Sequence, residues 1–169
     1  TPEENFRFVN QYFQHMGPLV RQHGGFIDKF IGDAIMALFD QKPDDALDSA
    51  IAMLHCLERE NLKRIQQGTF PIHIGIGINT GTLMLGTVGE SDRMESTVIS
   101  DAVNLASRLE GLTETYGVPL LISEHTRRKL NDPDRFDLRP LGEVQVKGKQ
   151  QMVTIYEVLN GHTQDRKSV

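Results

Sequence analysis

Apolar residues recur along this chain with two different spacings, and these spacings predict an alternation of helices and strands. Apolar side chains every three or four residues predict helices over residues 2–23, from Pro43 onwards, over 101–115 and over 124–130. Extended segments are predicted at 26–39, 72–78, 82–88, 97–99, 118–122, 135–147 and 152–158. In the first of these, two apolar runs flank Gly32-Asp33, which indicates a β-hairpin with its tip at that pair.

The segment 72–79 has the clearest period of two in the chain. Isoleucine occupies every second position from Ile72 to Ile78, while the positions between them are His73, Gly75, Gly77 and Asn79. One face of this strand is therefore bulky and the other is nearly bare. A bare face allows another backbone or a ligand to approach closely.

Helices between pairs of strands predict an α+β fold, with helices packed on a mostly antiparallel sheet. The chain begins with a helix, whereas a split βαβ unit would begin with a strand, so we expect such a strand ahead of Thr1. We expect one domain over residues 1–159 and a polar C-terminal tail over 160–169.

Composition narrows the class of partner. The 169 residues are 38% hydrophobic and 24% charged, which is ordinary for a globular protein, and no apolar run reaches the ~20 residues of a membrane span. The net charge of −5 argues against nucleic acid as a partner but leaves room for a single nucleotide. The lone Cys56 cannot form an internal disulfide. We therefore expect a cytoplasmic domain without membrane contact of its own, within a larger multidomain or membrane-anchored protein.

Two charged residues in the predicted hairpin stand among apolar neighbours. Asp33 at the tip of a rigid hairpin is suited to bind a hard cation, although an acid beside a glycine is also ordinary turn chemistry. Lys29 lies four residues earlier, within an apolar strand. It is either a positioned donor or a lysine at a sheet edge with its ammonium group in water.

A second pair of candidates lies on the third long helix. Asn104 and Arg108 are four residues apart and so share one helix face, where a guanidinium fork can match two phosphate oxygens. A solvated helix flank explains the same pattern. Lys147 and Lys149 lie in a turn between two strands, where a solvated hairpin tip is the simpler interpretation for each.

Taken together, four segments resemble the catalytic domain of the class III nucleotidyl cyclases, the adenylate and guanylate cyclase family. They span residues 26–158 in the family's order: FIDKFIGDAIMALF, HIGIGINTGTLMLGTVG, TVISDAVNLASRLEGLTE and VQVKGKQQMVTIYEV. The combination of GDAIMA with VNLASRLE is specific, and the second motif separates the chain from the related GGDEF-type diguanylate cyclases. The resemblance implies a ferredoxin-like nucleotidyl cyclase fold.

The resemblance also assigns roles to the candidate residues. Asp33 matches a metal-binding aspartate, and Lys29 and Thr97 match the two residues that contact the purine. A lysine with a threonine is the family's adenine pattern, since these side chains can donate to an adenine ring nitrogen and meet its exocyclic amine. Asn104 and Arg108 match the pair that orients the ribose and stabilises the developing charge, and Lys147 matches the lysine that holds the terminal phosphates.

The implied activity is that of an adenylate cyclase: the 3′-oxygen of ATP attacks its own α-phosphorus, which yields cyclic AMP and pyrophosphate. The family uses two divalent cations, Mg²⁺ or Mn²⁺, for each active site. Its sites lie between two subunits, so we expect a head-to-tail homodimer with two shared sites. In such a dimer, Asp33 would serve one site and the other five residues the second. We expect the dimer to bury the glycine-rich strand face and part of the first helix.

Two departures from the family pattern bear on activity. The family's first metal-binding aspartate lies on a strand ahead of the first helix, which would place it before Thr1, and Ser100 stands where glycine is common. We therefore expect the chain as written to have little or no activity. Two alternatives stay open: a non-catalytic cyclase-like module that binds nucleotide or dimerises to regulate its neighbours, and an α+β interaction domain with no nucleotide site.

Overall fold

Three long helices and two sheets make up the computed structural model, which describes residues 2–31, 34–83, 92–146 and 150–161. The helices are α1 (Pro2–Gln22), α2 (Pro43–Gln66), α3 (Asp92–Tyr116) and the short α4 (Glu124–Lys129), with 3-10 turns η1 (Pro133–Arg135) and η2 (Leu159–Gly161). The strands are β1 (Gly25–Ile31), β2 (Ala34–Phe39), β3 (Ile76–Ile78), β4 (Leu120–Ser123), β5 (Leu138–Gln145) and β6 (Met152–Val158).

The described strands form two separate sheets. Strands β1 and β2 pair as an antiparallel hairpin, and the other four strands form a sheet in the order β3-β4-β6-β5. In the larger sheet only β3 and β4 run parallel, with Ile76 opposite Leu120 and Ile78 opposite Ile122. The predicted α+β class with a mostly antiparallel arrangement is confirmed.

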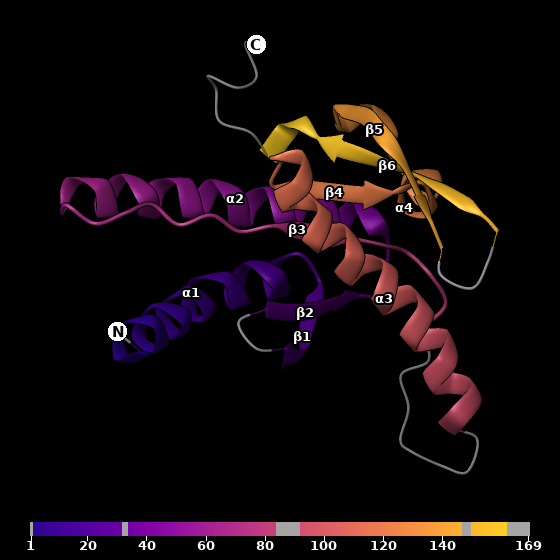
Figure 1. Ribbon diagram of the computed structural model, residues 1–169, viewed down its shortest axis with the longest axis horizontal. Coiled ribbons are helices and arrows are strands. Elements are labelled where there is room, and N and C mark those ends of the chain that lie inside the picture. The colour runs from indigo at the N-terminus through magenta and orange to yellow at the C-terminus, as the bar shows by residue number, and fades with distance from the viewer. Residues whose placement is uncertain (1, 32–33, 84–91, 147–149, 162–169) are drawn as a thin grey trace.

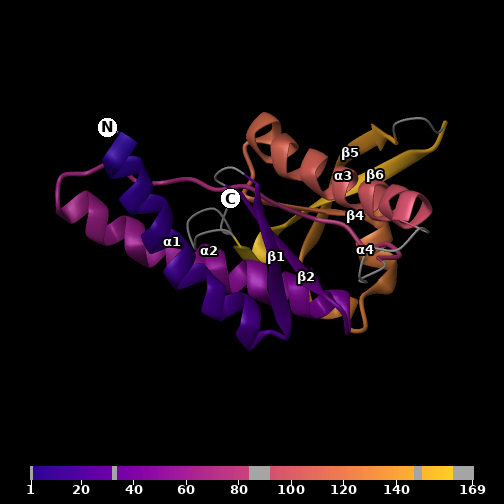
Figure 2. The ribbon, with the colours of Figure 1, turned by 90° about the horizontal axis from the view of Figure 1, so that it is seen from below.

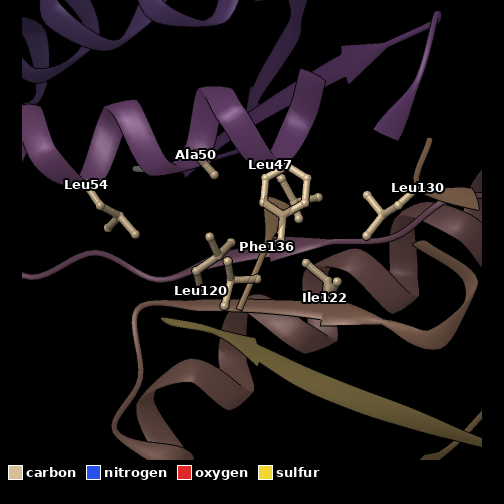
Figure 3. Close-up of a cluster of buried hydrophobic side chains, with 8 residues drawn as sticks. Leu47, Ala50, Leu54, Leu120, Ile122, Leu130 and Phe136 are labelled. Carbon is tan, nitrogen blue, oxygen red and sulfur yellow. The ribbon is translucent and has the colours of Figure 1, made fainter. Parts of the chain in front are cut away.

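Helices α2 and α3 cover opposite faces of the four-stranded sheet (Figure 1). Successive residues of β4 alternate between the two faces, so the strand contributes to the packing on both sides. Leu120 and Ile122 contact the α2 side, in a cluster completed by Leu47, Ala50, Leu54, Leu130, Phe136 and Val158 (Figure 3). Leu121 points the other way. It joins the α3 side with Leu105, Leu109, Val118, Val144, Val153 and Ile155.

Helix α1 and the β1-β2 hairpin pack beside α2, away from the larger sheet (Figure 2). Met16 and Val20 on α1 are almost fully buried, and the Phe13 ring packs at a tilt against Phe30 of β1 with ring centroids 4.6 Å apart. The helix ends at Gln22 and the chain turns at Gly24, close to where the sequence predicts; the φ of 82° at Gly24 lies in the left-handed region that glycine adopts easily. No helix in the described ranges is both long and apolar enough to cross a membrane.

The sequence predicts most of these boundaries, with two exceptions. Residues 97–99, predicted as extended, lie inside α3, which begins at Asp92 rather than at Asp101. Their β-branched side chains cost a helix only a few tenths of a kcal/mol each, and extending an existing helix adds a backbone hydrogen bond per residue.

The alternating segment 72–78 is a regular strand only from Ile76 onwards. The hydrogen bonds between β3 and the parallel strand β4 begin only at Ile76, because the residue before β4 is Pro119, which has no N–H to donate. Pro119 does accept a hydrogen bond through its carbonyl oxygen from the N–H of Ile76. Residues 82–83 of the strand predicted at 82–88 are not in a strand, and residues 84–88 lie outside the described residues.

A buried carboxylate links the start of α2 to the segment after α4 by hydrogen bonds. Asp44 is 1% exposed, and its two carboxylate oxygens accept hydrogen bonds from the backbone N–H groups of Asn131 and Asp132 at 2.8 and 2.9 Å. Burial alone would raise the pKa of Asp44, but these N–H donors outweigh it and hold the pKa below its ordinary value. The charged form is therefore the one that the fold stabilises.

We expect Asp44→Ala to lower the free energy of unfolding at pH 7 by about 3 kcal/mol, because two backbone N–H groups lose their charged acceptor. The wild-type carboxylate stabilises the fold above the unfolded-state pKa of about 4 and loses this effect as the pH falls through its lower folded-state pKa. Urea titrations at several pH values check both points. Asp134→Asn, at an exposed carboxylate, is the control. An equal difference in stability between wild type and Asp44→Ala at pH 7 and pH 3 would contradict the assignment.

Candidate active site on α3 and the hairpin

Helix α3 presents two of the predicted site residues on its outer side. Asn104 and Arg108 are both exposed, whereas Leu105 and Leu109 between and beyond them are buried against the sheet. The four-residue spacing places both polar side chains on one helix face, as predicted. A planar guanidinium and an amide side by side can hold a charged oxygen group and a hydroxyl of the same ligand.

Arg108 also links α3 to the larger sheet. Its guanidinium donates a hydrogen bond to the backbone carbonyl oxygen of Gln145, the last residue of β5. Lys147 follows two residues later and lies outside the described residues, so its side chain has no described position. The contact nevertheless brings Arg108 to the strand end from which the predicted phosphate-binding lysine follows.

Lys29 lies on β1, on the exposed face of the hairpin. Adjacent strand residues point to opposite faces, and Phe30 points towards Phe13 of α1, so Lys29 points away from α1. The β1-β2 register shifts between Ile27 and Lys29, which leaves Asp28 as a bulge. Such bulges redirect the side chains that follow them. Two large apolar side chains of the same strand are exposed: Phe26 at 39% and Phe30 at 54%.

Two other predicted residues are described less fully or not at all. Thr97 lies in the first half of α3, where the structure describes the helical backbone but not the side chain. Asp33 lies outside the described residues, in the connection between β1 and β2. Carboxylate oxygens are the donors that Mg²⁺ and Mn²⁺ prefer, so its chemistry fits the expected cation. Across the described part of the chain, no group of three acidic, His or Cys side chains is arranged to hold a metal ion.

The glycine-rich face of segment 72–79 has a different neighbour from the one expected. A Cβ added at Gly77 would lie 2.9 Å from the carbonyl carbon of Leu109 and closer still to Ala106 O and Glu110 N. A Cβ at Gly75 would meet Thr113. The close approach predicted for this face is confirmed. The expectation that a second subunit buries it is wrong, because α3 of the same chain already covers it.

Sequence reasoning missed a buried polar cluster beside this face. The side chain of Asn79 donates to the carbonyl oxygen of Ala102 on α3 at 3.1 Å and accepts from the hydroxyl of Ser123 at 2.7 Å. Ser123 and Thr126 are fully buried. The only signal in the sequence was an asparagine two residues after Gly77, at the end of this nearly bare strand face.

Comparison with known proteins identifies the family. The model of the adenylate and guanylate cyclase catalytic domain matches residues 1–159. The chain belongs to this family. The cyclase domain is 51% identical over 163 residues to an adenylate cyclase of Anabaena cylindrica, an alignment that covers 93% of this chain and 32% of that protein. The chain thus corresponds to about a third of the length of that relative.

Solved structures place the cyclase domain in the same fold. The crystal structure of the adenylyl cyclase CyaB from P. aeruginosa is 33% identical, with a TM-score of 0.72 over 92% of this chain and 82% of that one. The guanylyl cyclase Cya2 is 30% identical, with a TM-score of 0.66 over 94% of this chain and 81% of that one. The predicted resemblance to the class III cyclases is therefore confirmed, and the fold is one that adenylyl and guanylyl cyclases share.

Proposed function

We propose that this cyclase domain is the catalytic unit of an adenylate cyclase, with residues 1–159 as the domain and 160–169 as a polar tail. The observation that carries the proposal is the exposed polar face of α3, where Asn104 lies beside an Arg108 that reaches the end of β5. The 51% identity to a protein named adenylate cyclase supports the choice of ATP over GTP.

In the proposed reaction, the 3′-oxygen of ATP forms a bond to the α-phosphorus while the bond from that phosphorus to the bridging oxygen of the β-phosphate breaks. The hydroxyl proton passes to solvent, and pyrophosphate leaves. Asn104 holds the ribose, and Arg108 donates to the phosphoryl oxygens on which negative charge increases. Lys147 binds the terminal phosphates of the substrate, and Lys29 with Thr97 contacts the adenine ring.

Asp33 is the proposed metal ligand of this chain. Two divalent cations, Mg²⁺ or Mn²⁺, would supply the acidification of the 3′-hydroxyl and the neutralisation of the leaving pyrophosphate. We propose that the site forms between two copies of the domain, with Asp33 from one copy and the remaining residues from the other. The exposed Phe26 and Phe30 of the same strand support this arrangement, since exposed aromatic residues are enriched at subunit interfaces.

The test of the proposed function is the identity of the product. We expect the full-length protein with Mn²⁺ or Mg²⁺ to convert ATP to cyclic AMP much faster than it converts GTP to cyclic GMP. Cyclic GMP as the main product would overturn the assignment of the base. Absence of both cyclic nucleotides from a folded, dimeric, metal-loaded protein would overturn the catalytic proposal itself.

Lys29→Ala is expected to lower kcat/KM for ATP by about 10- to 100-fold, the effect of losing one charged hydrogen bond to the substrate. Steady-state rates over a range of ATP concentrations measure this. Lys63→Ala is the matched control, because Lys63 is an exposed lysine on α2 that pairs only weakly with Glu60 at 3.6 Å. Equal kcat/KM values for the two variants would remove Lys29 from the base-binding site.

A further inference from the structure

We propose that Asn79 is a positioning residue, which fixes where α3 lies along β3 and thereby where Asn104 and Arg108 meet the substrate. The proposal rests on the function proposed above and adds to it a residue that does not touch ATP. It concerns the strand face on which Gly75, Gly77 and Asn79 follow one another at every second position.

Because Gly75 and Gly77 have no side chains, α3 has no strand side chains to pack between on this face. Backbone atoms of Ala106 and Glu110 lie directly over Gly77, so the helix is close to the strand there. Helices usually keep their register on a sheet through interlocking side chains. A bare strand face lacks such side chains, so the position of α3 along β3 depends on the packing of Leu105 and Leu109 against the neighbouring strands and on polar contacts at the end of β3.

Asn79 supplies a polar fixed point at the end of this face. Its amide N–H donates to the carbonyl oxygen of Ala102 at 3.1 Å, one helical turn before Ala106 and two residues before Asn104. The next close approach is at Gly81, where an added Cβ would lie 3.0 Å from the Cβ of Ala102. Asn79 thus joins the helix within one turn of Asn104 and within two turns of Arg108.

The orientation of the Asn79 amide is itself fixed by buried neighbours. The backbone N–H of Thr126 donates to the hydroxyl oxygen of Ser123 at 3.2 Å, as the N-cap of α4. The single O–H of Ser123 then donates to the Asn79 side-chain oxygen at 2.7 Å. Because that oxygen is held by Ser123, the amide nitrogen must face Ala102.

The far end of this chain of hydrogen bonds is firmly anchored. Thr126 is fully buried, and its hydroxyl lies 2.9 Å from that of Thr80. Helix α4 is held on β6 through Arg127, whose guanidinium lies 5.5 Å from the ring centre of Tyr156. Arg127 also hydrogen-bonds Glu124 and holds the pKa of that carboxyl at about 2, so the pair stays charged at physiological pH. The ends of β3 and β4, α4 and α3 therefore form one connected unit.

Asn79→Asp tests the proposal with the smallest change of shape. The carboxylate still accepts from Ser123, but it cannot donate to Ala102, so α3 loses its fixed point. We expect kcat for ATP to fall by about 10- to 100-fold with KM changed less than about threefold, because misplacement of the reacting geometry slows the chemical step. Hydrogen–deuterium exchange should become faster in α3 around residues 102–110.

Asn61→Asp is the matched control. Asn61 makes the same kind of bridge at the other end of the segment, donating to Ile72 O and accepting from Ile72 N, both at 2.8 Å. It joins α2 rather than α3, so its loss should lower stability by a similar amount and leave kcat and the exchange of α3 unchanged. All three proteins are measured as full-length protein, at a temperature well below the lowest melting temperature.

The measured kcat values and exchange rates either support the proposed role of Asn79 or overturn it. A fall in kcat with faster exchange in α3 for Asn79→Asp, but not for Asn61→Asp, supports the proposal. Equal kcat values and equal α3 exchange in the two variants overturn it, even when the wild-type protein makes cyclic AMP. A wild-type protein that makes no cyclic nucleotide refutes the proposed function, and the exchange data then still report whether Asn79 holds α3. Should Asn79→Asp fail to fold, Asn79→Ser, which is too short to reach both partners, is judged by the same measurements.

Discussion

Gly77→Ala is expected to destabilise the domain by about 3 kcal/mol or more and to lower its melting temperature by about 10 °C. The added Cβ would lie 2.9 Å or less from backbone atoms of Ala106, Leu109 and Glu110 on α3. Backbone atoms in a packed helix cannot rotate away as a side chain can, so α3 must move away from the sheet. That movement loosens the cluster around Leu109, which is fully buried.

Alanine substitutions at two other glycines are expected to have smaller or opposite effects on stability. At Gly75 the added Cβ would collide chiefly with the Thr113 side chain, which can adopt another rotamer, so Gly75→Ala should cost less than Gly77→Ala. At Gly111, inside α3, the added Cβ meets nothing within 4 Å, and alanine there should stabilise the helix by up to about 1 kcal/mol. Thermal unfolding of the three variants measures the order. A Gly77→Ala protein as stable as Gly111→Ala would show that α3 does not pack against this strand.

Local sequence patterns predicted the elements of this fold because each pattern reports on a single segment. The turn at Gly24 after α1, the start of α2 at Pro43 and the β1-β2 hairpin all follow from residues within a few positions of the boundary. The start of α3 was predicted wrongly because a β-branched run at 97–99 favours a strand locally, while the surrounding residues continue the helix.

These local patterns do not predict contacts between segments that are distant in the sequence. The bare face of 72–79 predicted a close neighbour, but the choice between a ligand, a second subunit and α3 depends on residues about 30 positions further along. The partner of Arg108 is the carbonyl group of Gln145, and every residue has such a group, so no residue type marks it. The same holds for Asn79, whose partners Ala102 and Ser123 lie 23 and 44 residues away. The family resemblance predicted which side chains to consider but not what holds them in place.

Arg108→Ala is expected to lower kcat for cyclic AMP formation by about 100-fold with little change in KM, since the guanidinium acts on charge that develops only in the transition state. Arg108→Lys should recover only part of the loss, because an ammonium group lacks the planar fork. Arg128→Ala is the control at an exposed arginine of α4. Lowered stability with an unchanged kcat would mean that Arg108 serves only to tie α3 to Gln145.

Mixing two inactive variants separates the roles further. In the proposed dimer, each site takes Asp33 from one copy and Arg108 from the other, so a heterodimer of Asp33→Ala with Arg108→Ala carries one site with both changes and one with neither. Random exchange at equal concentrations makes half of the dimers mixed, and one of the two sites in each is intact. Activity should therefore recover to about a quarter of the wild-type value. A mixture no more active than the mean of the two variants, with subunit exchange verified by a tag on one of them, would place Asp33 and Arg108 in the same subunit's site or outside a shared one.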